Sequence, residues 1–280
     1  MIKWREERRD SGFLAGMDFS SSNPPFSDLD DSEVRDDNMD ISAVRGEVNG
    51  LKKEESEEVS DSIILREISQ REILHWNYKG LTRFPTELLN HGAHIQELYL
   101  KENLVEQVPE KLYLKMPFLS NLHLSRNNIS KIPKDFSKLS QLTLLDLSRN
   151  QLLEYPDCLN GIKTLKTLDL SHNRIQELPE KISELINLEY LVVISNSIKR
   201  VPESISLLKK LSGLYLSRNC IRELPNSLVE CYSLRELYLD HNHLQYIPGS
   251  LVKLRELALL SLSGNLLRYL PHLPFVSSPR

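Results

Sequence analysis

Apolar residues recur at a regular step along most of the chain, from about residue 63 onward. In one representative unit they fall at Leu165, Leu168, Leu170, Ile175 and Leu178, and a proline follows directly. The alternation across Leu168 and Leu170 predicts a short strand with both leucines on its buried face. The segment after the proline spaces its apolar residues three apart, which predicts a short helix or 3-10 turn packed against the same core.

Prolines and asparagines make the period visible. The prolines are spaced by 24 residues twice and then by 23 residues six times, at Pro85, Pro109, Pro133, Pro156, Pro179, Pro202, Pro225, Pro248 and Pro271. Asparagines precede eight of them by six residues, at Asn103, Asn127, Asn150, Asn173, Asn196, Asn219, Asn242 and Asn265. A fixed period of this length is typical of repeat proteins, in which each unit covers the apolar face of its neighbour.

The pattern L-x-x-L-x-L-x-x-N-x-L followed by a Leu-Pro step resembles the leucine-rich repeat. The resemblance covers nine units, from about Arg71 to Pro271. The 23-residue unit is similar to the intracellular class that includes Ras-suppressor and Scribble-type scaffolds. It implies an α/β solenoid shaped like a horseshoe, with a parallel sheet on the concave face and short helical or 3-10 segments on the convex face. It also implies that each asparagine is buried and hydrogen-bonds the turning backbone of neighbouring units.

The two ends of the repeat region depart from this pattern. In the first unit Lys79 stands where the asparagine belongs and Trp76 replaces the third leucine, so we expect this unit and residues 62–68 to form an N-terminal cap. After Pro271 the sequence continues for nine residues without a polar capping unit. Three alternatives remain open: residues 274–276 fold over the last repeat, another surface covers it, or the chain is a shortened product of a longer one.

Charge divides the chain into two parts. Residues 1–62 contain 17 acidic and 8 basic residues, a net charge of −9, whereas residues 63–280 carry +5. Such a polar segment buries too little apolar surface to offset its chain entropy. We therefore predict a disordered acidic tail over 1–62 and a repeat domain over 63–280. The tail is a solvating segment or a phosphorylatable arm, with Ser27 three residues before Asp30, and we expect it to be weakly attracted to the body.

Candidate chemistry is sparse. The cysteines Cys158, Cys220 and Cys231 form no cluster, and the sequence has neither a signal-like apolar stretch at its start nor an apolar run long enough to span a bilayer. These features predict a cytoplasmic, reducing location without membrane insertion. No catalytic motif is found, and the histidine pairs His91/His94 and His241/His243 lack a third ligand nearby in sequence. We expect no enzyme activity, no metal and no cofactor.

Strand alternation also predicts which side chains leave the core. A central outward column should contain His75, Tyr99, His123, Asp146, Asp169, Val192, Tyr215, Tyr238 and Ser261. A second column, one residue before the asparagines, includes Glu102, Arg126, Arg149, His172, Arg218 and His241. We expect Asp146 and Asp169 to lie side by side, about 5 Å apart, as a solvated acidic patch rather than an acid–base pair.

The sixth unit is unusually apolar at its outward positions. Tyr190, Val192 and Ile194 stand where sister units place Thr, Asp and Ser. With Tyr215 and Tyr238 they predict an exposed apolar strip for a protein partner, although β-branched residues also simply suit a strand. Because aromatic residues and arginine are enriched at binding hot spots, the predicted protein-binding set is Tyr99, His123, Arg126, Asp146, Arg149, Asp169, Tyr190, Val192, Ile194, Tyr215, Arg218 and Tyr238.

These observations favour a non-catalytic scaffold or adaptor that binds a protein partner through its concave face. The alternative, which rests on the resemblance alone, is a regulatory or targeting subunit of a signalling enzyme such as a phosphatase or a small GTPase. A third alternative, an enzyme, would need a catalytic site that the sequence does not reveal, and a polar cluster around Asp146 and Asp169 would reopen it. Nucleic acid is not expected as a partner, because the outward columns mix acidic residues with arginine and the body has a surplus of only five positive charges.

Overall fold

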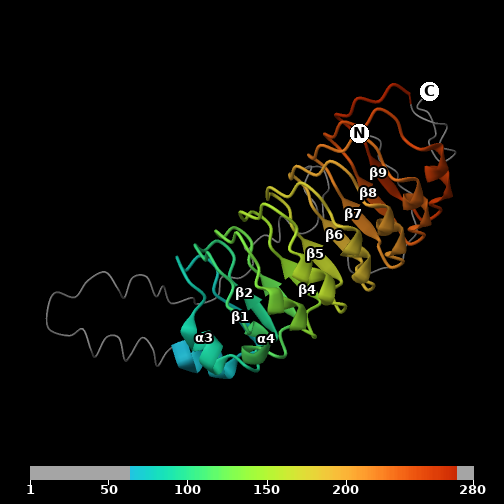
Figure 1. The fold of residues 1–280 in the computed structure, drawn as a ribbon. Helices are drawn as coiled ribbons and strands as arrows, with labels where there is room; N and C mark the ends of the chain where they lie inside the picture. Colours follow the sequence, from blue (N-terminus) through green and yellow to red (C-terminus); the bar gives the residue numbers. More distant parts are fainter. Residues whose placement is uncertain (1–63, 270–280) are drawn as a thin grey trace, which may run out of the picture.

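The computed structural model of the protein describes residues 64–269, and these residues form one solenoid. A single nine-stranded parallel sheet runs through it, and the strands follow one another in chain order (Figure 1). The predicted acidic tail over 1–62 and the possible C-terminal cover at residues 274–276 lie outside the described residues. The α/β solenoid with a parallel sheet is therefore confirmed.

Each strand is three residues long, and its middle residue is a buried leucine. The strands are β1 (Ile73–His75), β2 (Glu97–Tyr99), β3 (Asn121–His123), β4 (Leu144–Asp146), β5 (Thr167–Asp169), β6 (Tyr190–Val192), β7 (Gly213–Tyr215), β8 (Glu236–Tyr238) and β9 (Leu259–Ser261). The leucine side chains point into one continuous apolar core. The two flanking residues of each strand therefore lie on the open face of the sheet.

Short helical segments form the opposite wall of the solenoid (Figure 1). They are α3 (Thr86–His91), α4 (Leu112–Lys115), η2 (Lys134–Lys138), η3 (Asp157–Gly161), η4 (Glu180–Glu184), η5 (Glu203–Leu207), η6 (Asn226–Glu230) and η7 (Gly249–Lys253). The α-helical segments belong to the two units with the 24-residue step, and the 3-10 segments belong to the 23-residue units. A proline directly precedes every one of these segments except α4. The fixed φ of proline suits the start of a helix.

The asparagines join neighbouring units through hydrogen bonds. The Asn127 side-chain amide donates to the carbonyl oxygens of Leu100, in the preceding unit, and Leu124, in its own unit, at 2.9 and 3.0 Å. Its side-chain oxygen accepts a hydrogen bond of 2.9 Å from the backbone amide of Val105. The same arrangement recurs from Asn103 to Asn265. The expected hydrogen bonding of this asparagine column is confirmed, and six of its eight members are buried, whereas Asn196 and Asn265 are partly exposed.

The residue before each asparagine adopts a left-handed backbone conformation. Its φ is 54° at Arg126, 53° at Arg149 and 54° at His172, and the last unit uses Gly264 at 69°. This turn ends the strand and directs the asparagine side chain inward. The backbone amide of the left-handed residue donates to a carbonyl of the next unit, as Arg126 does to Ser148. Side chains other than glycine pay a steric cost in this region. The second predicted column is therefore a column of left-handed turns, which sequence reasoning did not anticipate.

The N-terminal end of the core is covered within the described residues. Residues 64–70 are helical, and Ile68 is fully buried in the core. Trp76 is also buried, and its indole nitrogen donates to the Glu67 carboxylate at 3.3 Å. The side-chain oxygen of Asn103 accepts a hydrogen bond from the Lys79 amide, so the first unit is linked to the asparagine column without its own asparagine.

Candidate protein-binding face

The strand pairing places the central outward column in strict register. His75 is paired with Tyr99, Asp146 with Asp169, and Tyr215 with Tyr238. The pairing continues through His123 and Val192 to Ser261, so the column runs unbroken across all nine strands. The predicted set is thus brought together on one face of the sheet, where Arg126, Arg149 and Arg218 lie along the edge at which the strands end.

The N-terminal third of this face is an aromatic stack. The Tyr99 ring lies 4.3 Å, centroid to centroid, from both His75 and His123. The Tyr99 hydroxyl donates to the Glu97 carboxylate at 2.8 Å. Burial, together with this carboxylate, raises the pKa of Tyr99 to about 12. The ring therefore stays neutral and fixed in place at physiological pH.

Asp146 and Asp169, which we call the carboxylate pair, occupy the middle of the face. Asp146 accepts hydrogen bonds from the backbone amide and the hydroxyl of Ser148, at 2.9 and 2.7 Å, and its other oxygen lies 3.9 Å from the His123 ring nitrogen Nδ1. Asp169 is only 6 % exposed and accepts a 2.8 Å hydrogen bond from the Ser171 amide. The prediction of a solvated acidic patch is wrong for Asp169, because this residue is buried beside Val192 on the neighbouring strand.

Burial and proximity separate the acidities of the two carboxyl groups. Burial, and then the charge of Asp146, raise the pKa of Asp169 to about 7, although Ser171 and Arg149 act in the opposite direction. Burial would raise the pKa of Asp146 as well, but hydrogen bonds from His123, Ser148 and Ser125 hold it below its usual value. Asp169 is therefore the weaker acid of the two, because a carboxyl group resists ionisation when it is buried beside another negative charge.

An apolar group next to the carboxylate pair forms a second, smaller core on the open face. This concave apolar cluster consists of Val192, Ile194 and Tyr215, with Tyr190 and Tyr238 packed against it. Val192 is fully buried and Tyr215 is 1 % exposed. The predicted exposed strip is thus wrong about exposure: these side chains shield one another, and only Tyr190 and Tyr238 remain partly accessible.

Two tyrosines give the cluster its shape. The rings of Tyr215 and Tyr238 stack at 5.0 Å, centroid to centroid, with 15° between their planes. The Tyr215 hydroxyl donates to the Glu236 carboxylate. The cluster therefore combines an apolar body with a polar edge, which is how tyrosine commonly serves at interfaces.

Gly213 makes room for these rings. A Cβ at this position would lie 2.7 Å from Tyr190 Cδ1 and 2.7 Å from Tyr215 Cε2. Such distances are far shorter than ordinary carbon contacts, so both rings depend on the missing side chain. Sequence reasoning did not single out Gly213, although the signal was present: the corresponding strand position holds Thr167 in one sister unit and Glu236 in another.

Not all basic side chains along the rim of the face can offer a partner a positive charge. Arg126 is ion-paired with Glu102. The pKa of His172 is lowered by burial and by the charges of Arg149 and Arg218, so its ring is neutral at physiological pH. Arg149 and Arg218 are exposed and form no ion pair within the described residues.

The cysteines and metal-binding side chains form no reactive constellation in residues 64–269. Cys158, Cys220 and Cys231 are free, and burial raises the pKa of both Cys158 and Cys231 to about 11. Thiols of this acidity are poor nucleophiles at neutral pH. In the described part of the chain, no three His, Cys, Asp or Glu side chains are grouped closely enough to hold a metal ion. Nor does any helix there have the length and apolarity needed to cross a membrane.

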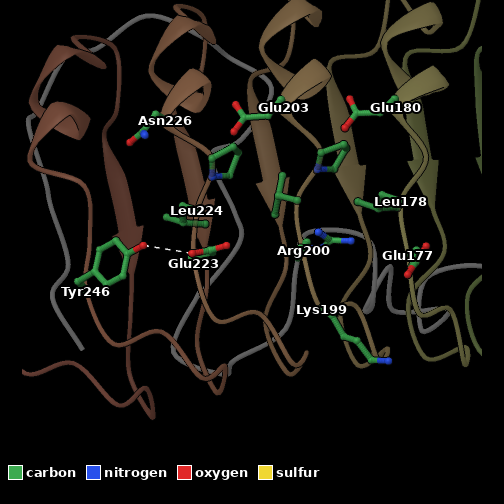
Figure 2. A pocket seen from close by; sticks show the side chains of 13 residues that line it. Glu177, Leu178, Glu180, Lys199, Arg200, Glu203, Glu223, Leu224, Asn226 and Tyr246 are labelled. Carbon is green, nitrogen blue, oxygen red and sulfur yellow. Dashed lines mark hydrogen bonds between the residues drawn. The ribbon is translucent and has the colours of Figure 1, made fainter.

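A second concavity lies along the edge of the solenoid, where successive units turn at their prolines. This groove has a volume of about 450 Å³, and Leu178 and Leu224 are among the residues that line it. Figure 2 shows the lining side chains. Charged side chains of both signs line its rim, and the Tyr246 hydroxyl donates to the Glu223 carboxylate at 3.2 Å. Because the rim mixes Glu177 and Glu223 with cations such as Arg200, it offers a ligand no charge of a single sign.

The sequence matches known families, and the fold is similar to solved structures. The family described as leucine-rich repeat region matches residues 155–272, and that described as leucine rich repeat matches residues 79–152. The leucine-rich-repeat region of FLRT2, solved in an octameric complex with Latrophilin 3 and Unc5D, is 27% identical with a TM-score of 0.64, over 76% of this chain and 67% of that one.

Two further structures show the range of proteins that share the fold. The ectodomain of the Arabidopsis thaliana receptor kinase GASSHO1/SCHENGEN3, in complex with CASPARIAN STRIP INTEGRITY FACTOR 2, is 29% identical with a TM-score of 0.60, over 69% of this chain and 24% of that one. A leucine-rich-repeat protein of Leptospira interrogans is 24% identical with a TM-score of 0.59, over 75% and 65%. The chain thus spans less than two thirds of the length of these two proteins.

Proposed function

Because this chain belongs to the leucine-rich-repeat proteins, we propose that it is a non-catalytic protein-binding module whose concave sheet face holds the partner. One observation carries the proposal. The core-facing positions repeat the same leucine and asparagine from unit to unit, whereas the open-face column changes from histidine and tyrosine to aspartate, valine and tyrosine. Uniform positions maintain the solenoid, and the variable column distinguishes one partner from another.

The size and chemistry of the face support this role. Nine strands span eight gaps of about 4.8 Å, so the face extends over roughly 40 Å. It combines carboxylates with tyrosine and arginine, two residue types that are enriched among the residues that dominate binding energy at interfaces. The related FLRT2 and GASSHO1/SCHENGEN3 repeat units were both solved with protein partners.

The finer assignment is a scaffold or adaptor in a reducing, cytoplasmic environment. The three free cysteines support this location, since none of them is paired in a disulfide. The similarity of the 23-residue Leu-Pro unit to intracellular scaffolds points the same way.

Site-specific photo-crosslinking tests the binding face. We would replace Tyr99 or Tyr238, on the open face, by p-benzoylphenylalanine in the full chain, and make the same replacement at Tyr232 as a matched control. Tyr232 is 62% exposed and lies on a return segment outside the sheet. Irradiation in cells should yield the same discrete protein adducts from the two sheet positions and none of them from Tyr232.

Two outcomes distinguish the alternatives. Adducts that form only from Tyr232 would overturn the concave-face proposal. If the crosslinked partner is an enzyme, its rate is measured with and without the purified chain. A changed rate would favour a regulatory subunit over a passive scaffold.

A further inference from the structure

We propose that residues 28–40 of this chain, an acidic segment, bind a strip of cations beyond the ends of the strands. This basic strip consists of Arg149, Arg174, Lys199, Arg218 and Arg222. It borders the concave face, and its occupant belongs to the same chain, so the contact goes beyond the proposed partner site there. An external partner that uses this edge has to displace the acidic segment.

The repeat pattern gathers the cations of the strip. Asn173 and Ile175 are buried, whereas the residues one before, one after and three after the asparagine are exposed, and the same alternation holds in the neighbouring units. From the unit of Asn150 to that of Asn242 there are fifteen such outward positions. They hold five arginines or lysines, three histidines and no acidic residue. The repeat thus places cations in rows from which carboxylates are missing.

Backbone hydrogen bonds hold these rows side by side. The Arg174 amide donates to the Leu152 carbonyl at 2.8 Å, and the Cys220 amide donates to the Ile198 carbonyl at 2.9 Å. Such bonds tie the segment after each asparagine to the same segment of the preceding unit. Because successive strands lie about 4.8 Å apart, the strip covers three steps, or roughly 14 Å.

No neighbour within residues 64–269 forms an ion pair with the cations of the strip. Elsewhere in the same range, Arg126 and Lys166 are each paired with a glutamate. The charges of the strip also act on one another's surroundings, since burial and then Arg149 and Arg218 lower the pKa of His172. Like charges held together repel one another, so an acidic ligand that neutralises them is favoured.

The glutamates nearest in sequence leave the strip positive. Glu154, Glu177 and Glu223 stand one residue beyond the outermost row, and Arg200 stands in that same row. Glu223 accepts a 3.2 Å hydrogen bond from the Tyr246 hydroxyl. Six cations against three carboxylates leave a surplus of positive charge along this edge.

The chain itself contains a segment of complementary charge. Residues 28–40 hold seven acidic residues and one arginine, a net charge of −6, and they lie outside the described residues. Residues 41–63, which join this segment to the solenoid, can span up to roughly 75 Å. From β1 to β7 there are six gaps of about 4.8 Å, or roughly 29 Å, so the segment can reach the strip. A ligand on the same chain also has a high effective concentration.

A nucleic acid is the less favourable occupant of the strip. Single strands are usually held by aromatic side chains that stack on the bases, in addition to cations. None of the fifteen outward positions holds Phe, Tyr or Trp. The strip therefore offers charge without a stacking surface, which suits the carboxylates of a peptide.

Photo-crosslinking within the purified full chain tests the contact. p-Benzoylphenylalanine replaces Val34, in the middle of the acidic segment, and mass spectrometry identifies the residues to which it is joined. The strip variant neutralises three cations: Arg174→Gln, Lys199→Gln and Arg222→Gln. Its matched control neutralises three exposed cations on or beside the 3-10 segments: Lys163→Gln, Lys181→Gln and Lys253→Gln. Circular dichroism and urea unfolding check that both variants fold.

Adducts should form within single chains, on residues 149–245, at 0.1 M NaCl. Their yield should fall about tenfold on the strip variant, because three exposed charge pairs are lost, and it should stay unchanged on the control. Raising NaCl to 1 M should abolish the adducts without any substitution in the repeats, because the Debye length shrinks from about 10 Å to about 3 Å.

Three results would overturn the inference: adducts spread evenly over the repeat domain, equal yields from the strip variant and the control, or adducts only between two chains. Since the Val34 probe leaves the repeats unchanged, the position of the adducts decides the matter even if the strip variant does not fold. Crosslinking from Tyr99 and Tyr238 is a separate measurement, so the concave-face proposal can fail or stand on its own.

Discussion

Two sets of polar side chains are enclosed in this protein, and one is neutral whereas the other is ionisable. Each asparagine of the repeat column uses both its amide and its oxygen, as Asn127 does with Leu100, Leu124 and Val105. The carboxylate pair lies on the open face of the same sheet, where Asp169 is 6 % exposed and accepts a 2.8 Å hydrogen bond from the Ser171 amide. The contrast separates neutral amides, which can be buried once they are hydrogen-bonded, from a carboxyl group whose charged form is disfavoured by burial.

The largest expected effect lies in the asparagine column. Asn127→Ala should lower the free energy of unfolding by about 3–5 kcal/mol, because it leaves several buried backbone groups without partners. Urea unfolding followed by circular dichroism measures this loss. Asn128→Ala is the matched control, since the neighbouring Asn128 side chain only accepts an exposed hydrogen bond from Gln151, and it should cost less than about 0.5 kcal/mol. Equal losses would remove the structural role assigned to the column.

A substitution in the carboxylate pair should increase the free energy of unfolding instead of lowering it. Asp169→Asn should raise the free energy of unfolding at pH 7.5 by about 1–3 kcal/mol, because it replaces a buried, largely ionised group by a neutral one of the same shape. Since the pKa of Asp169 is raised in the folded state, the native protein gains stability as pH falls from about 7 towards 4. The advantage of Asn should therefore shrink over that range.

Urea unfolding of the two proteins between pH 4 and pH 8 measures this dependence. Asp157→Asn serves as the exposed control and should show no such trend. If Asp169→Asn destabilises the fold at every pH, then Asp169 belongs with the asparagines as a structural group, and the contrast between the two sets disappears.

The smallest expected effect concerns the space beneath the tyrosine rings. Gly213→Ala should cost about 1–2 kcal/mol, because its Cβ would overlap Tyr190 and Tyr215 and displace the concave apolar cluster. Gly249→Ala has no atom within 4 Å of the new Cβ and should change stability by less than about 0.5 kcal/mol. Thermal unfolding compares them. An unaffected Gly213→Ala protein would show that the rings are free to move, and that the cluster is not preformed.

Much of the fold could be predicted because the repeat fixes it many times over. The step of leucine, asparagine and proline predicts the parallel strands and their register, and the resemblance to the leucine-rich repeat implies the bonding of the asparagines. The central column from His75 to Ser261 also follows directly, since alternation within each strand and the constant step between units determine it.

The properties of the face could not be predicted in the same way, because they arise between units. The burial of Asp169 and the closing of Val192 beneath the tyrosines depend on how closely neighbouring strands and rings approach. The left-handed turn at Arg149 is a backbone property that the residue type does not reveal, since arginine has no preference for it. A pattern of residue types shows which side chains share a face, but not how much solvent reaches them.

The constant register of the units has a consequence for how this surface could change in evolution. Deleting residues 174–196, one whole unit, would leave every leucine and asparagine contact of the same kind on either side of the junction. The same event would remove Val192 from the column and bring Asp169 directly beside Tyr215. Unequal recombination between repeats could therefore rewrite the order of chemical groups on the face in a single step, without the fold having to adapt.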